Sequence, residues 1–396
     1  MDTAARHYVT GFFACVCLAL GSVSLLNYQV DPYLLHQWDS PLLQRPRQLN
    51  EKLGAWAKTY AVARYRPAII YIGNSRTELG LPTGMRALFD GKRVFNSAVS
   101  GASIGDAIRL AEHVARVSRV ETMVWGIDAP TFSLDMGAAR VEDSLTGAGH
   151  GFFARRALVN LKRGLTLDMT EDSVRILTGN AGDTCRSNLA LYGQRDETCT
   201  LMGIKHWLGT KDAIPVRLQE FGDGLGPTRP STLAFDASIA KLCRGAMRLR
   251  LYINPTHALT LYALHWRGKW DAMQAWQRGL AQIAERHRRQ GCDVRLYDFS
   301  GFNSITTEAT PLVSGKPDMH YYWEVSHYRD NVGRLILARL FGGGTPPPAD
   351  FGVELTQANI GAHQAAMRAA RDRYRVEHAH ETAYAQRVLD GPLIRR

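Results

Sequence analysis

Several common signatures are missing from this sequence of 396 residues, and each absence excludes a class of protein. The six cysteines form no Cys-x-x-Cys pair, which argues against a structural zinc site. No helix-turn-helix, RNA-binding or zinc-finger pattern occurs, so the net charge of +11 does not indicate a nucleic-acid partner. A hydrophobic content of 45% argues against disorder. The positive charge favours an anionic partner, such as lipid head groups or acidic polysaccharide, or reflects an arginine-rich surface.

Charge is also absent from residues 9–28. A helix of roughly 20 residues, rising 1.5 Å per residue, spans one bilayer core of about 30 Å. Arg6 precedes the run and the next arginine is Arg45, so the positive-inside rule places the N-terminus in the cytoplasm. We therefore expect a cytoplasmic tip and a transmembrane signal anchor over residues 1–30. A cleaved signal peptide is the alternative, although no clear small-x-small cleavage site follows the run.

Apolar runs of strand length alternate with helical patterns through the middle of the chain. The expected strands are 68–72, 93–99, 121–127, 248–254 and 293–299, and the expected helices are 49–63, 104–117, 268–289, 330–340 and 356–388. Strands separated by helices predict a parallel sheet in an α/β domain over residues 31–341. An insertion at about 131–240 interrupts the alternation, and we expect it to form a lid or substrate wall. Residues 342–396 are expected to form a linker and a helical tail.

Four cysteines are placed to form disulfides in an oxidising compartment. Cys185 and Cys199 would close a loop of about 15 residues, which adds roughly 3 kcal/mol to the free energy of unfolding. Cys243 and Cys292 each precede an expected strand, so they are candidates to be neighbours.

A serine and a histidine lie where nucleophilic catalysis needs them. Ser75 follows the first expected strand, at the end where parallel sheets bind their ligands. His327 lies just before the expected helix 330–340, and Glu324 is three residues upstream. A histidine can take the proton of a serine hydroxyl when an acid holds its ring in the useful tautomer. The combination predicts a serine hydrolase or acyltransferase, and we expect the Glu324 carboxylate to raise the pKa of His327.

These residues resemble the sequence blocks of the SGNH (GDSL-like) hydrolase superfamily. Gly73-Asn74-Ser75 is similar to its Gly-Asp-Ser block, Asn96 and Gly101 correspond to its second block, and Glu324 and His327 correspond to its Asp-x-x-His block. The third block, Gly-x-Asn-Asp, is replaced by Trp125-Gly126-Ile127-Asp128, which lacks the asparagine. More narrowly, the chain resembles membrane-anchored periplasmic members associated with cell-surface polysaccharide O-acetylation, similar in kind to the alginate acetylation proteins. The resemblance covers about residues 27–340.

The resemblance implies a three-layer α/β/α flavodoxin-like fold with a parallel central sheet, preceded by the transmembrane helix. It implies that the amides of Ser75 and Gly101 form the oxyanion hole, and that no metal or cofactor is required. It further implies a single-pass protein of the bacterial inner membrane whose main domain is periplasmic. The expected substrate is an acyl ester, above all an acetyl ester, of a cell-envelope polysaccharide. An expected partner is a membrane-bound O-acyltransferase.

Polar residues near the expected strand ends are candidates for substrate binding: Asn74, Arg76, Asn96, Asp128 and His257. Arg76 either binds an anionic substrate group or forms a structural ion pair. Asp128 would oppose an oxyanion if ionised, so we expect it to orient another group or to be structural. His257 either contacts substrate or lies on the surface. The departures at Asn74 and Asp128 favour a second hypothesis, in which the protein is a catalytically inactive scaffold that binds glycan or a membrane acyltransferase.

Two other nucleophile and base assignments compete with Ser75 and His327. Gly101-Ala102-Ser103-Ile104-Gly105 is a literal G-x-S-x-G pattern between a strand and a helix, the context of the α/β-hydrolase nucleophile. Ser103 also suits an ordinary helix N-cap. His320, with Asp318 two residues before it, is the competing base, but no acid stands three residues upstream of it.

The membrane orientation can be tested with a reporter fused after residue 40. Alkaline phosphatase, which requires export, should be active there, because the basic residue before the apolar run keeps the N-terminus in the cytoplasm. A β-galactosidase fusion at the same position serves as the control and should be inactive. The reverse result would contradict the orientation, and with it the oxidising compartment that the disulfides require.

Overall fold

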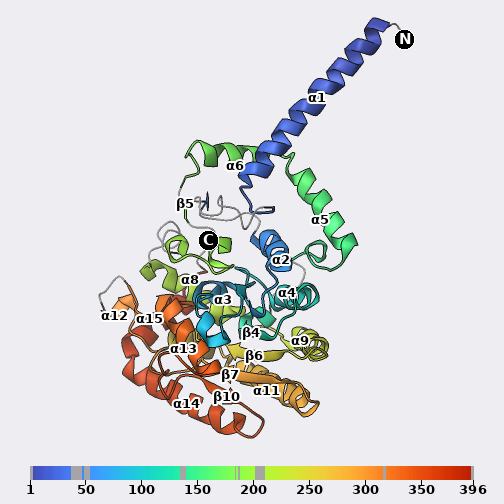
Figure 1. Ribbon diagram of the computed structural model, residues 1–396. Helices are drawn as coiled ribbons and strands as arrows, with labels where there is room; N and C mark the ends of the chain where they lie inside the picture. The colour runs from blue at the N-terminus through green and yellow to red at the C-terminus, as the bar shows by residue number, and fades with distance from the viewer. Residues whose placement is uncertain are drawn as a thin grey trace.

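A six-stranded, mostly parallel sheet forms the centre of the molecule (Figure 1). The computed structural model describes residues 3–36, 47–48, 54–133, 140–182, 184–185, 188–200, 210–314 and 318–393. The strand order is β10-β7-β6-β4-β2-β3, and β10 is antiparallel to β7 while the other five run parallel. The bounds are β2 Ile69–Ile72, β3 Val94–Asn96, β4 Thr122–Ile127, β6 Arg248–Ile253, β7 Val294–Asp298 and β10 Val353–Leu355. The expected α/β class with a parallel central sheet is confirmed.

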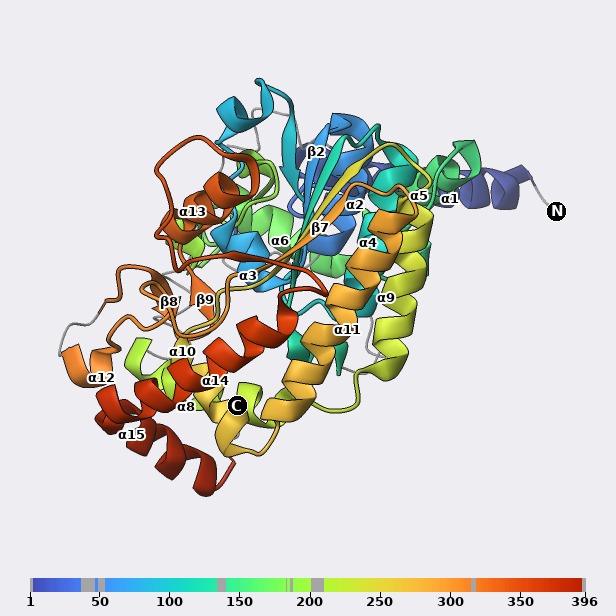
Figure 2. The same cartoon turned by 90° about the horizontal axis from the view of Figure 1, so that it is seen from below.

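Alternate residues of the strands enter two separate hydrophobic cores. In β2, Ile70 and Ile72 pack on one face, whereas Ile69 and Tyr71 pack on the other. The first face is covered by α2 (Gly54–Tyr65), α4 (Ile104–Val117), α9 (Arg229–Leu242) and α11 (Trp270–Arg289), and the second by α13 (Asp330–Phe341). Figure 2 shows α9 and α11 along one face of the sheet and α13 on the other side. Because both faces are covered, polar side chains gather at the strand ends.

The five parallel strands end at one edge of the sheet, and polar residues follow several of them. Helix α3 (Ser75–Gly80) begins three residues after β2, and Asp128 directly follows β4. Asn254 directly follows β6, just before α10 (Ala258–Trp266). The topology therefore places Ser75, Asp128 and Asn254 at the edge where ligands of parallel sheets bind.

The expected insertion between β4 and β6 separates into parts with different neighbours. Helix α9 is the crossover that a parallel connection needs. Helices α5 (His150–Arg163) and α6 (Leu167–Leu177) lie near the base of the N-terminal helix (Figure 1), and β5 (Thr184–Cys185) pairs with β1 (Arg47–Gln48). Helix α8 (Thr210–Gly224) packs against α10 and against β8 (Tyr322–Glu324). Of these helices, α8 is the one that reaches the segment carrying Glu324.

One long apolar helix, α1 (Thr3–Val30), projects from the globular part (Figure 1). Its most apolar stretch of 18 residues has no buried side chain. Near its end, Asn27 and Val30 are buried because the helix contacts α6 there. The length and composition of α1 suit a membrane span or a signal anchor.

The chain after residue 342 is more integrated than a linker and tail. Strand β10 extends the sheet along β7, and the helix expected over 356–388 is wrong, because two helices form: α14 (Ile360–Glu377) and α15 (Ala379–Asp390). The break lies at His378, whose ring stacks on Tyr374 at 4.3 Å and whose Nδ1 contacts Glu381 at 2.8 Å. Glu381 also accepts hydrogen bonds from the amide and hydroxyl of Thr310. These contacts turn α15 back onto α8 and α10.

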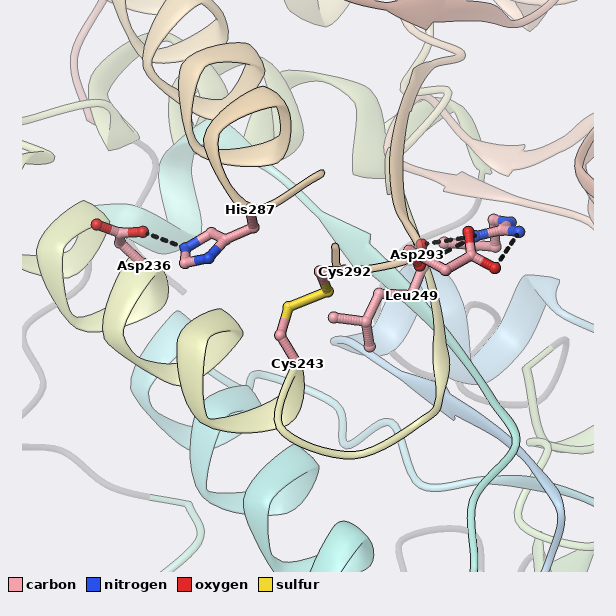
Figure 3. Close-up of a disulfide and its surroundings, with 7 residues drawn as sticks. Asp236, Cys243, Leu249, His287, Cys292 and Asp293 are labelled. Carbon is pink, nitrogen blue, oxygen red and sulfur yellow. Dashed lines mark hydrogen bonds and ion pairs between the residues drawn. A yellow bond between two sulfur atoms is a disulfide. The ribbon is translucent and has the colours of Figure 1, made fainter. Parts of the chain in front are cut away.

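A disulfide joins Cys243 and Cys292, the pair expected to be neighbours (Figure 3). It links the end of α9 to the residues just before β7, and the nearby contact of His287 with Asp236, at 2.7 Å, links α11 to α9. Cys199 is also disulfide-bonded, while the side chain of Cys185 lies outside the described residues. Cys15 and Cys17 in α1 are free.

Removing this disulfide should destabilise the domain. The two cysteines are 49 residues apart, so the chain-entropy model gives a loss of up to about 4 kcal/mol in the free energy of unfolding for Cys243→Ala/Cys292→Ala. Urea titration of the detergent-solubilised protein measures it. Cys15→Ala/Cys17→Ala is the matched control and should leave the midpoint unchanged. An unchanged midpoint in the first variant would contradict a structural role for the bond.

Candidate active site

Ser75 lies on a sharp turn between β2 and α3. Gly73 has φ +155°, and a Cβ at that position would stand 2.3 Å from the Thr77 hydroxyl oxygen, so the turn requires glycine there. Asn74 caps the helix, because its side-chain oxygen accepts a hydrogen bond from the amide of Arg76 at 3.0 Å. The turn leaves Ser75 partly exposed at the first position of α3.

His327 is brought to Ser75 by a small antiparallel ribbon. Strands β8 and β9 (His327–Tyr328) are separated by Val325 and Ser326, and Glu324 is the register partner of His327. The Ser75 Oγ lies 2.7 Å from His327 Nε2, although the two residues are 252 positions apart. His327 Nδ1 contacts Glu324 Oε1 on the other side of the ring. This is the serine–histidine–acid order that nucleophilic acyl transfer requires.

The ribbon can approach α3 because a glycine faces it. A Cβ at Gly80 would lie 2.0 Å from the ring of Tyr328, so a larger residue would push β9 away from α3. Tyr328 also donates a hydrogen bond to Asn254 Oδ1 at 3.1 Å, and its hydroxyl meets that of Tyr252 at 3.0 Å. The histidine ribbon is therefore held against both α3 and the end of β6.

Glu324 is buried yet ionised. Burial alone would raise its pKa, but the charges of Arg217 and His327 and the hydrogen bond from the Ser326 amide lower the pKa of Glu324 to about 2. Arg217 comes from α8, and its Nε donates to Glu324 Oε1 at 3.1 Å. The Ser326 amide donates to the other carboxylate oxygen at 2.7 Å. Because the Glu324 carboxylate stays ionised, it can hold the His327 ring with Nδ1 protonated.

The pKa of His327 is lower than that of a free histidine, although Glu324 acts on it in the expected direction. Burial of the ring is the main cause, and the charges of Arg217 and Arg76 act in the same direction. Glu324 does raise the pKa, but it does not outweigh burial. His327 is therefore neutral near pH 7, with a free Nε2 that can accept the Ser75 proton.

Asp128 is the centre of a buried polar network beside Ser75. Its Oδ2 accepts hydrogen bonds from Asn74 at 2.7 Å, from Arg76 at 3.1 Å and from Asn254 at 3.1 Å. Arg76 also donates to the backbone oxygen and hydroxyl of Ser326, at 3.0 and 2.6 Å. Asn74, Arg76 and Asp128 thus connect the nucleophile turn to the histidine ribbon, so each has a structural task. Their part in substrate binding stays a prediction.

The loop after β3 carries the expected second oxyanion donor. Gly101 has φ +74° and is exposed, and a Cβ at that position would stand 3.4 Å from the guanidinium of Arg140. The loop is fixed to α3 through Glu78, which contacts the Ser100 hydroxyl at 2.5 Å. Buried Lys58 of α2 joins Glu78 and the Ala98 carbonyl, both at 2.6 Å. The role of Gly101 in an oxyanion hole stays a prediction.

Several expected residues lie away from the reacting groups. Asn96 is buried and donates to the carbonyls of Thr77 and Leu81, at 2.9 and 3.3 Å. His257 is fully buried as the N-cap of α10, and its Nε2 contacts the Glu308 carbonyl. Neither has a side chain free to meet a substrate.

The competing nucleophile and base are also separate from the Ser75 site. Ser103 is buried in a capping box with Asp106 at the start of α4. Asp318 and His320 are exposed. The backbone amide of His320 donates a hydrogen bond to Glu308, and its ring contacts Tyr321 rather than a serine. The geometry favours Ser75 and His327 over both competitors.

A small pocket lies at the carboxyl ends of β4 and β6, and Asp128 is one of the residues that line it. Its lining is mainly apolar and includes Phe221, Leu261 and Trp276 together with Asn254. Neither Ser75 nor His327 lines it. We therefore assign the chemistry to the accessible face of Ser75 rather than to this pocket.

Arg217, Lys58, Glu78 and Asn254 were not expected from the sequence. Glu78 lies three residues after Ser75, on the next turn of α3, so its position close to the nucleophile could have been inferred from the sequence. Arg217 offered no comparable signal, because it is 107 residues from Glu324 and comes from the insertion.

Comparisons with known proteins add little to this geometry. No protein-family model matches the chain, and no curated protein matches it. Among solved structures, the chain is similar to one titled "The structure of a putative platelet activating factor from Streptococcus pneumonia", with 11% identity. The match covers 72% of this chain and 91% of that chain, with a TM-score of 0.34. A TM-score of 0.34 is too low to establish a shared fold or function.

The charges around His327 predict opposite pH shifts for two variants. Activity requires neutral His327, so it should be full above the pKa of His327 and fall as the pH drops through it, below the usual 6.5. Glu324→Gln removes the group that raises this pKa, so the acid limb should move to lower pH while the plateau rate falls by roughly 10²–10⁴-fold. Arg217→Gln removes a group that lowers it, so the limb should move to higher pH.

The profile of initial ester hydrolysis rate against pH measures both shifts. Arg217→Lys keeps the charge and should move the limb less than Arg217→Gln. Profiles of Glu324→Gln and Arg217→Gln that coincide with that of the unmodified protein would remove both residues from the mechanism.

Proposed function

We propose that the protein is a serine esterase or O-acyltransferase that acts on acyl esters, above all acetyl esters, of a cell-envelope polysaccharide. The observation that carries the proposal is the alignment of Ser75 Oγ, 2.7 Å from His327 Nε2, with Glu324 at the other ring nitrogen. Both the serine and the histidine are partly accessible to a substrate. That arrangement supports attack on an acyl carbonyl without any metal or cofactor.

The reaction follows from the hydrogen-bond geometry. Ser75 Oγ attacks the acyl carbonyl while its proton passes to His327 Nε2, and ionised Glu324 stabilises the imidazolium that forms. The backbone amides of Ser75 and Gly101 stabilise the oxyanion; losing one such donor typically raises the barrier by about 3–4 kcal/mol. His327 returns its proton to the leaving alcohol as the carbon–oxygen bond breaks. Water or a sugar hydroxyl then attacks the acyl-serine while its proton passes to His327 Nε2. His327 returns this proton to Ser75 Oγ as the bond between Oγ and the acyl carbon breaks, giving hydrolysis or transfer respectively.

A flavodoxin-like SGNH fold is part of the proposal. The parallel strands lie in the order β3-β2-β4-β6-β7, which corresponds to 2-1-3-4-5 when they are numbered along the chain. That is the order of flavodoxin-like sheets, whose ligands bind next to the first strand. Ser75 follows β2, the first of these strands, which supports the assignment of the nucleophile.

The cellular setting is proposed from α1 and from charge. We propose that α1 anchors the protein in the bacterial inner membrane with the main domain in the periplasm, an oxidising compartment that suits the disulfides. The net charge of +11 and the exposed Arg140 beside Gly101 suit an acidic glycan. A membrane-bound O-acyltransferase is the proposed partner for transfer.

One observation favours the alternative of a catalytically inactive scaffold. Asp128 stands where the resemblance would place the asparagine that donates to the oxyanion, and its carboxylate is already engaged by three donors. A site with fewer oxyanion donors could bind an acylated glycan, or a membrane acyltransferase, without turning the ester over.

Labelling with a fluorophosphonate probe distinguishes the enzyme from the catalytically inactive scaffold. The enzyme proposal predicts covalent labelling of the folded full chain and its loss in Ser75→Ala, because the probe reports an activated serine. Ser103→Ala is the matched control: it should lower the free energy of unfolding by about 1 kcal/mol through loss of a cap and keep its labelling. Absence of labelling in a correctly folded protein would support the scaffold, and labelling lost in Ser103→Ala alone would overturn the assignment of Ser75.

A further inference from the structure

Helices α5 and α6 and the turn between them carry many exposed large apolar side chains. These are Phe153, Leu158, Leu161, Leu165, Leu167, Val174 and Leu177, with Leu167 87% exposed and Leu161 54% exposed. Leu158, Leu161 and Leu165 recur at the spacing of one helix face and its continuation, opposite the buried side of α5 formed by Phe152, Arg156 and Asn160. Contiguous exposed apolar side chains of this kind mark a docking surface.

The turn between these helices is fixed to the end of α1. Asn27 Nδ2 donates to the Gly164 carbonyl and to the Thr170 hydroxyl, both at 2.8 Å. Beyond the helix, Tyr33 donates to Asp172 at 2.6 Å and to Asp168 at 3.0 Å. Figure 1 shows α5 and α6 diverging on either side of the base of α1.

These hydrogen bonds fix the position of the α5–α6 turn along the axis of α1. Asn27 is three residues before the end of α1 at Val30, which is about 4.5 Å along the helix axis at 1.5 Å per residue. A Cβ at Gly164 would lie 3.7 Å from the Ser24 hydroxyl, one helical turn deeper. The turn is therefore level with the last turns of α1, where Leu25 is itself 59% exposed.

We propose that the α5–α6 turn, with Leu161, Leu165 and Leu167, inserts into the lipid interface of the same membrane that α1 crosses. The inference rests on the proposed anchor, and it adds a second attachment that fixes the orientation of the catalytic domain. Lipid is the occupant because the turn is bonded to the last turns of α1, the proposed membrane span, where Leu25 is exposed as well. Exposed Arg155 and Lys162 on α5 also suit anionic head groups.

The side of α5 that faces the domain makes contacts that hold the turn in place without burying it. Arg156 is buried, lies 4.9 Å from the ring centroid of Trp56 and donates to the Trp56 carbonyl at 2.8 Å. Arg163 lies over the same ring at 5.1 Å. These contacts fasten α5 to α2 by its polar side, which leaves its leucines facing outward.

Photo-crosslinking of the full chain in nanodiscs tests the inference. The discs contain phosphatidylethanolamine and phosphatidylglycerol, and p-benzoyl-phenylalanine replaces one residue at a time: Leu161, Leu167, Phe12 in α1, or Val376 in α14. Val376 is the matched control, because it is 71% exposed and lies far along the chain from the turn. We expect lipid adducts at Leu161, Leu167 and Phe12 and none at Val376.

The crosslinker positions test the inserted turn and the α1 anchor separately. Adducts at Phe12 without adducts at Leu161 and Leu167 would overturn the inserted turn and leave the anchor standing. No lipid adduct at Phe12 would overturn the anchor, and the inserted turn with it. Crosslinking in intact cells checks the occupant: adducts of Leu167 with protein instead of lipid would show that the surface binds a protein partner and would overturn the proposal.

Discussion

The site depends above all on the buried ion pair between Arg76 and Asp128. Arg76 follows the nucleophile, Asp128 follows β4, and Ser326, bonded to the same guanidinium, precedes His327. Removing one partner of a buried pair typically costs about 3–5 kcal/mol, because the other charge is left uncompensated. The nucleophile turn, the end of β4 and the histidine ribbon are therefore stable as a unit. This unit explains how Ser75 and His327, 252 residues apart, come within 2.7 Å.

The acid of the triad has to satisfy two partners at once. Glu324 must stay ionised in a buried position, which Arg217 ensures by donating to Oε1, the same oxygen that His327 contacts. The same positive charge lowers the pKa of His327, so the base remains neutral at a more acidic pH than an ordinary histidine would. Through α8, the insertion thus supplies a charge that acts on both Glu324 and His327.

The helices and strands that were predicted correctly each have a sequence signal within the element or next to it. The strand ending at Ile72 is a short apolar run followed by Gly73. The helix 104–117 combines apolar residues at helical spacing with the capping residue Ser103. Each element can therefore be recognised from a few neighbouring residues. The Glu324–His327 pair could be proposed because only two residues separate its members. Long-range features carried no such signal: Arg217, the Lys58–Glu78 pair and strand β10 depend on contacts that form only when distant segments pack. The break at His378 was missed because helical periodicity continues on both sides of it.

The proposed function depends on acylation of Ser75 with His327 as the base. The most direct measurement is the mass of the Ser75-containing peptide after rapid acid quench of the full chain reacting with p-nitrophenyl acetate. The proposed mechanism predicts a burst of p-nitrophenol of up to one equivalent per chain, matched by an equal amount of acetyl group on Ser75, with both absent in His327→Ala. Turnover without acetylated Ser75, or an acetyl group on the Ser103 peptide instead, would contradict it.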